Sequence, residues 1–121
     1  MATGSPFVLI VNGSSSPVNL AYMRVNYQCL LEGGEPWEVR GWRFLDPGEI
    51  TLIKNPTANR WLYVYAESWD GLMWKGPFLE VVPFWSSFHR CTGLGLSVSE
   101  SAAVVGFLEV DTKKVVKKLV P

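Results

Sequence analysis

The stretch RWLYVYAE, from Arg60 to Glu67, determines the fold class that the sequence predicts. Its side chains follow the two-residue period of a β-strand, in which neighbouring residues point to opposite faces. The aliphatic face holds Leu62, Val64 and Ala66, and the aromatic face holds Trp61, Tyr63, Tyr65 and Glu67. We therefore expect a strand whose aliphatic face lies in the hydrophobic core.

Other short apolar runs lie between turn signals such as Asn12-Gly13, Asp46-Pro47-Gly48 and Asp70-Gly71. Short strands at this spacing are typical of a β-sandwich or barrel, and no window shows a long helical period. The predicted strands cover residues 7–11, 18–27, 37–44, 49–53, 61–68, 78–82, 94–98 and 103–110. The sequence predicts an all-β fold, either a small antiparallel β-sandwich or a partly open β-barrel.

Three local features carry finer predictions. The continuous apolar run 7–11 suggests a strand that is buried on both faces. The apolar alternation in 18–27 slips between Tyr22 and Met23, where a β-bulge would return the apolar side chains to one face. The segment 113–120 fits either a short C-terminal helix or an edge strand.

The 121 residues fit a single domain, 1–121, with a disordered tail at 1–5 and a core at about 6–120. The formal net charge is zero, which argues against a nucleic-acid partner. The N-terminal region has no basic segment, and its apolar run is too short for a signal peptide or a membrane span. The two cysteines are too few for a disulfide scaffold. These features together predict a cytoplasmic protein.

Few residues suit catalysis or metal binding. His89 is the one histidine, and the chain contains no nucleotide-binding loop or serine-nucleophile motif. Cys91 and His89 would share a strand face and are the one candidate nucleophile pair. Glu109 and Asp111 would share a strand face but offer too few ligands for a cation unless Glu67 or Asp70 joins them. We therefore expect no enzyme activity, no cofactor and no metal.

The aromatic residues have two interpretations. They either support a second packed layer of the protein itself or form a platform for a ligand or partner. The candidate binding residues are Trp37, Trp42, Arg43, Trp61, Tyr63, Tyr65, Glu67, Trp69, Asp70 and Trp74.

The favoured hypothesis is a non-enzymatic binding or interaction module that uses an aromatic patch for a protein partner. A small-ligand or carbohydrate-binding β-domain is the alternative, and a Cys–His enzyme is a weaker one. Edge strands and zero net charge also allow a homodimer.

An ordered set of motifs resembles the bacterial family known as domain of unknown function 1036, over about residues 7–119. The motifs are Val11-Asn12, residues 18–22, Trp37-x-x-x-Gly41-Trp42, Pro47-Gly48, residues 63–67, Trp74-x-Gly76 and residues 106–112. The resemblance implies an architecture of short strands and no established function. Members of that family typically carry several cysteines, and only Cys91 matches one of those positions here. The absence of the other family cysteines agrees with a reducing compartment.

Overall fold

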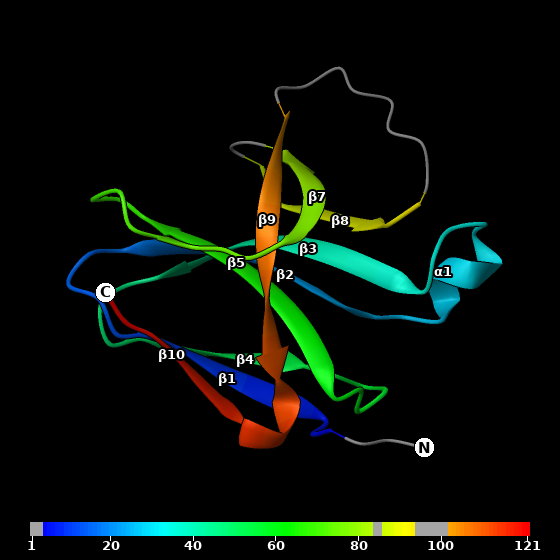
Figure 1. Ribbon diagram of the computed structural model, residues 1–121, viewed down its shortest axis with the longest axis horizontal. Coiled ribbons are helices and arrows are strands. Elements are labelled where there is room, and N and C mark those ends of the chain that lie inside the picture. The colour runs from blue at the N-terminus through cyan, green and yellow to red at the C-terminus, as the bar shows by residue number, and fades with distance from the viewer. Residues whose placement is uncertain (1–3, 84–85, 94–101) are drawn as a thin grey trace.

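The computed structural model describes residues 4–83, 86–93 and 102–121, and it confirms the all-β prediction. A nearly closed, six-stranded antiparallel barrel lies beside a small mixed sheet (Figure 1). The predicted strand at 94–98 lies outside the described residues. In the segment expected to be a tail, the backbone N–H groups of Gly4 and Ser5 donate to the Ala58 carbonyl and to Thr112 Oγ1.

Six strands form the barrel, and neighbours in the sheet are antiparallel. Their spatial order is β7 (Phe78–Pro83), β9 (Ala102–Asp111), β5 (Trp61–Ser68), β2 (Val18–Val25), β3 (Trp37–Leu45) and β8 (Phe88–Cys91). Side chains link the two end strands, because the Arg90 guanidinium donates to the Val81 carbonyl at 2.6 Å. The strand β6 (Met73–Trp74) pairs with β5 as a hairpin whose turn contains the turn signal Asp70-Gly71.

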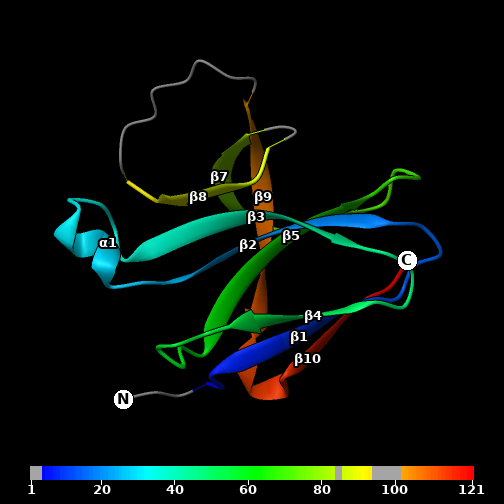
Figure 2. The same ribbon diagram turned by 180° about the vertical axis from the view of Figure 1, so that it is seen from behind.

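The small sheet lies on one side of the barrel strands in both views (Figures 1 and 2). Its order is β10 (Val116–Leu119), β1 (Phe7–Asn12) and β4 (Ile50–Lys54). β1 and β10 are parallel, which the antiparallel prediction missed. The 3₁₀ turn η1 (Thr112–Lys114) leads from β9 to β10, so the edge-strand alternative for the C-terminal segment is correct. The short helix α1 (Gln28–Leu31) was not predicted.

β2 and β5 lie between two hydrophobic clusters. The first cluster fills the space between the small sheet and the outer face of these strands, and it includes Leu62 and Val64, as predicted. The second cluster fills the barrel interior with side chains from all six barrel strands, including Ala21, Tyr65 and Phe107. A strand between two clusters buries both of its faces, so its apolar residues need not alternate with polar ones.

This arrangement corrects two local predictions. The register between β2 and β3 does shift, but the extra residue lies on β3, since Leu20 pairs with Arg43 and Tyr22 pairs with Arg40. β2 needs no bulge because each of its faces meets its own cluster. The run at β1 is not buried on both faces: Val8 and Ile10 are buried, whereas the alternate residues are exposed or half-buried.

The two cysteines form a disulfide between Cys29 in α1 and Cys91 in β8, with their Cα atoms 5.5 Å apart. The family resemblance left Cys91 without the other family cysteines, and this bond was not predicted. Cys29 lies outside every predicted strand, and the loop that follows it contains Gly33-Gly34. The fold instead places that loop beside β8, where the backbone N–H of Glu35 donates to the Thr92 carbonyl at 2.9 Å.

Candidate functional site

The ten candidate binding residues do not gather on one surface. Four of them line the barrel interior, where Trp37 meets Tyr63 with ring centroids 5.4 Å apart and Trp42 meets Tyr65 at 6.1 Å. Tyr65 is buried and the other three are half-buried. The aromatic face of β5 therefore packs against the protein's own opposite strands, which was the first of the two interpretations.

The other candidates are spread around the barrel. The Arg60 guanidinium lies over Trp61, with its central carbon 4.6 Å from the centroid of the Trp61 ring. The Trp74 indole donates to the Val120 carbonyl at 2.9 Å and packs against the first cluster. Asp70 accepts a hydrogen bond from the Ser68 hydroxyl within the β5–β6 turn. Local contacts thus account for these side chains without a ligand.

Burial and the Glu67 carboxylate raise the pKa of Tyr65 to about 12, because both disfavour the phenolate. The Tyr65 hydroxyl donates to Glu67 Oε2 at 3.1 Å.

We expect Glu67→Gln to lower the pKa of Tyr65 while leaving it above 10.0, since burial, the larger cause, remains. Titration of ¹³C-labelled tyrosine rings by NMR measures this shift, with Tyr65→Phe to assign the signal. Glu109→Gln, which removes the carboxylate beside Tyr63, is the control and should leave the Tyr65 titration unchanged. An unchanged pKa in Glu67→Gln would contradict the assignment.

One exposed aromatic pair remains at the end of the barrel. Trp69 is 66% exposed and Phe44 is 49% exposed, and their ring centroids lie 5.5 Å apart. Across the sheet, Phe44 pairs with Asn19, Asn19 with Glu67, and Glu67 with Met73, so these four side chains share one face. We call the five residues Phe44, Trp69, Asn19, Glu67 and Met73 the Phe44–Trp69 surface. It combines exposed apolar groups with an amide and a carboxylate.

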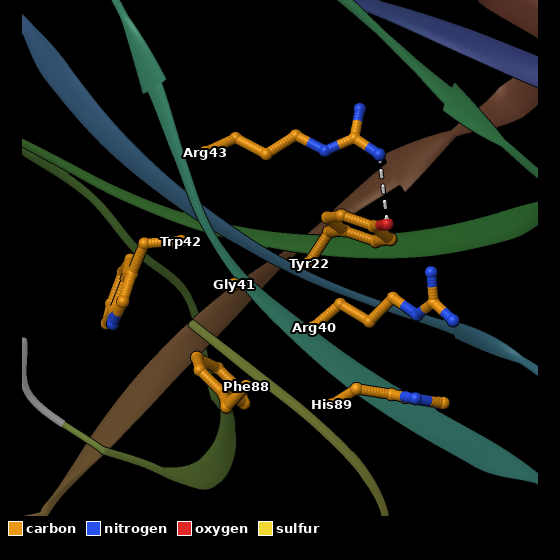
Figure 3. Close-up of a pocket in the computed structure, with 7 residues that line it drawn as sticks. All are labelled: Tyr22, Arg40, Gly41, Trp42, Arg43, Phe88 and His89. Carbon is orange, nitrogen blue, oxygen red and sulfur yellow. Dashed lines mark hydrogen bonds between the residues drawn. The ribbon is translucent and has the colours of Figure 1, made fainter. Parts of the chain in front are cut away.

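A second feature is a recess of about 320 Å³ that opens beside β3. Tyr22, Arg40, Gly41, Trp42, Arg43, Phe88 and His89 line it, and we call it the arginine recess (Figure 3). Residues three apart on a regular strand point to opposite faces. Because the extra residue on β3 lies between them, Arg40 and Arg43 instead share the face of their partners Tyr22 and Leu20.

Arg43 joins the barrel to the small sheet beside this recess. Its Nη1 donates to the Leu52 carbonyl at 2.7 Å and to Thr51 Oγ1 at 2.8 Å, and its Nη2 donates to the Tyr22 hydroxyl at 3.2 Å. The Arg24 guanidinium donates to the Lys54 carbonyl at 2.6 Å. Two outward carbonyls on the free edge of β4 are thus capped by arginines, which hinders pairing with another strand.

Glu38 is the buried carboxylate of this region, with a side chain only 1% exposed. It accepts hydrogen bonds from Arg24 Nε and Asn26 Nδ2, meets His89 Nε2, and lies 3.6 Å from Arg40 Nε. Burial alone would raise the pKa of Glu38, but the hydrogen bonds and the positive charges of the arginines outweigh burial and lower the pKa below 4.5. Glu38 is therefore an anion that organises the cations around it.

Two further recesses of about 550 Å³ each lie against β7. One is lined by the candidates Trp37 and Tyr63 together with Phe78 and the carboxylates Glu35 and Glu80. The other has Tyr65 at its base and the exposed side chains of Met73, Leu79 and Val104 around it. They bring candidate aromatics to the surface, with two carboxylates in the first recess and the single cation of Lys75 in the second.

Sequence reasoning identified Trp42 and Arg43 in the arginine recess but missed Arg40, His89 and Phe88 as neighbours. Gly41 was the available signal, because a glycine within a strand often marks a bulge. A Cβ at Gly41 would lie 2.6 Å from the Phe88 ring, so the missing side chain admits that ring. His89 follows from strand pairing, as it lies opposite Arg40 on β8.

The Cys91–His89 pair does not have the form that the weaker enzyme hypothesis requires. Cys91 is in the disulfide, so it has no thiol to act as a nucleophile in this state. The two carboxylates considered as cation ligands have separate partners: Glu109 accepts a hydrogen bond from the Tyr63 hydroxyl, and Asp111 pairs with Arg60. The absence of enzyme activity stays a prediction.

No protein-family model, no curated protein and no solved structure matches this chain. The resemblance to domain of unknown function 1036 stays a prediction. Within the described ranges, the structure contains no helix with the length and apolar character needed to cross a membrane.

Proposed function

We propose that this chain is a non-enzymatic binding module that contacts a protein partner through the Phe44–Trp69 surface. One observation carries the proposal: the rings of Phe44 and Trp69 pack edge to face, while Phe44 stays 49% exposed and Trp69 stays 66% exposed. Exposed aromatics of this kind are enriched among the residues that dominate binding energy at interfaces, because burying them removes much apolar area from water.

The neighbouring groups support a specific contact. Asn19 and Glu67 lie between Phe44 and Met73 in the same cross-strand row, so two hydrogen-bonding groups are flanked by apolar ones. Met73 is 53% exposed, and methionine side chains adapt to irregular partner surfaces. An apolar centre with a few polar groups is the usual composition of a transient interface.

The experiment compares proteins captured from the source organism by the wild-type chain and by variants. We expect one protein to be retained by the wild type and by Leu31→Ala, an exposed control on α1, and to be lost with Trp69→Ala. With that protein purified, Trp69→Ala should weaken binding about thirtyfold, equivalent to about 2 kcal/mol. Equal affinity of the wild type and Trp69→Ala would contradict the proposal.

A second copy of the chain is one such protein, and the homodimer stays a prediction. Light scattering of the wild type and of Trp69→Ala tests it directly.

Carbohydrate binding is the second candidate function, favoured by the position of Asn19 and Glu67 beside an open indole. Sugars stack on aromatic faces while nearby amides and carboxylates bind their hydroxyl groups. Fluorescence titration against a glycan panel distinguishes the two functions, because Trp69 reports on its own surroundings. A shift that Trp69→Phe abolishes would favour the sugar over the protein partner.

A further inference from the structure

The arginine recess contains more positive than negative charge. The guanidinium groups of Arg24 and Arg40 pair with the single carboxylate of Glu38, and that of Arg43 lies over the neighbouring Tyr22 ring. Arg43 donates to one carbonyl and one hydroxyl of β4 and to the Tyr22 hydroxyl, and all three acceptors are neutral. It has no salt bridge within the described part of the chain. Two positive charges of this cluster are therefore uncompensated.

Hydrogen-bond donors are also left over at this site. Arg40 Nε is buried and lies 3.6 Å from Glu38 Oε2, too far for a hydrogen bond, and it has no hydrogen-bond partner among the described residues. A buried donor without an acceptor is unfavourable, and a ligand oxygen that accepts from it removes that cost. An arginine has five N–H donors, and the three bonds of Arg43 leave its remaining donors available.

The side chains are arranged for one ligand. Arg43, Tyr22, Arg40 and His89 extend in the same direction from adjacent strands, whereas Trp42 and Phe88 lie on the other side of Gly41 (Figure 3). The Tyr22 ring supports Arg43, whose guanidinium carbon lies 5.1 Å from the ring centroid. The recess thus has a cationic end held in place by packing and an aromatic end.

From these observations we infer that the arginine recess binds a small organic oxyanion, a carboxylate or a phosphate monoester attached to an apolar group. Guanidinium groups bind both kinds of oxyanion through paired hydrogen bonds. The volume, about 320 Å³, lies at the lower end of the range for ligand pockets, which limits the ligand to a small molecule or a terminal group. This inference is independent of the Phe44–Trp69 surface.

The test uses the full chain and three probes of similar shape: benzoate, phenyl phosphate and neutral benzamide. Isothermal titration calorimetry should show that at least one of the two anions binds at least tenfold more tightly than benzamide. Binding of that anion should be weaker at high salt than at low salt. Tighter binding of benzoate identifies a carboxylate ligand, and tighter binding of phenyl phosphate identifies a phosphate ligand. If neither anion is preferred over benzamide, the inference is wrong.

Arg40→Gln is the decisive variant, because Arg40 is 39% exposed and removing it should leave the fold intact. We expect it to weaken anion binding at least tenfold and Arg40→Lys to weaken it less, since lysine keeps the charge and loses the paired donors. Arg60→Gln, which removes a cation that pairs with Asp111 elsewhere, and Trp69→Ala should both bind normally. NMR of the arginine Nε–H groups should place the shift at Arg40. Unchanged binding in Arg40→Gln would overturn the inference.

Discussion

Reducing the bond between Cys29 and Cys91 should lower the free energy of unfolding by about 4 kcal/mol, because the bond closes a loop of 62 residues in the unfolded chain. The entropy of closing a loop grows with its length, so a bond between distant residues restricts the unfolded state strongly. For a chain of this size, the change corresponds to roughly 10–20 °C in the unfolding midpoint. Both sulfurs are buried, so the folded state should keep its shape after reduction.

Thermal unfolding with and without a phosphine reductant measures the effect, and mass spectrometry confirms the state of the cysteines. The double variant Cys29→Ala, Cys91→Ala is the matched control, and the reductant should leave its midpoint unchanged. Equal midpoints of the oxidised and the fully reduced wild type would show that the bond adds no stability.

The disulfide also bears on where the protein works. Stable disulfides are typical of oxidising compartments, whereas the sequence alone suggested a reducing one. The cytoplasmic location stays a prediction. Trapping free thiols in cells of the source organism, followed by mass spectrometry of the Cys29 and Cys91 peptides, decides between the two locations.

The fold class followed from the sequence because its strongest signal is local. The alternation from Arg60 to Glu67 gives the bounds of β5 and its core face, and the observed strand runs from Trp61 to Ser68. The turn at Asp70-Gly71 likewise predicts its hairpin, and glycine there has a positive φ of 96°. Such patterns need no knowledge of distant partners.

The candidate site depended on long-range pairing, which one strand's pattern does not contain. The apolar alternation appeared to slip between Tyr22 and Met23 because β2 buries both of its faces. Only the packing of β2 between the two clusters shows that both faces are buried. The two-residue period alone would place Arg40 and Arg43 on opposite faces, because the extra residue of β3 appears only when β3 is aligned with β2. Cys29 could be paired only once α1 had been placed beside β8.

The same packing explains why most candidate aromatics are not an open patch. A barrel this small is filled by its own side chains, and here the filling includes Trp37, Tyr63 and Tyr65. At the barrel end, Trp69 has no opposite strand over it among the described residues. The exposure of the pair therefore follows from its place at the end of β3 and just after β5, which aromatic content alone does not predict.

Glu38→Ala should destabilise the protein by about 3–5 kcal/mol, the usual loss when one member of a buried ion pair is removed. The Arg24 side chain is only 12% exposed, so its charge would stay in a largely dry position without a counter-ion. Asn26 and His89 would lose an acceptor at the same time. Chemical denaturation at neutral pH measures the loss. The control Glu109→Gln, at an exposed carboxylate that only meets the Tyr63 hydroxyl, should change stability by less than about 1 kcal/mol.

Lowering the pH removes the charge of Glu38 while leaving its side chain in place. The folded-state pKa of Glu38 is lower than 4.5, so its contribution to stability is complete above that pH and is lost as the pH falls through the folded-state pKa. The stability difference between the wild type and Glu38→Gln should therefore narrow below pH 4.5, because protonation gives the wild type the neutral side chain that glutamine already has. The same comparison in a His89→Gln background removes the chain's one histidine from the titration. If the difference stays constant down to pH 3, Glu38 stabilises the fold through packing alone, and the cation cluster beside the arginine recess does not depend on its charge.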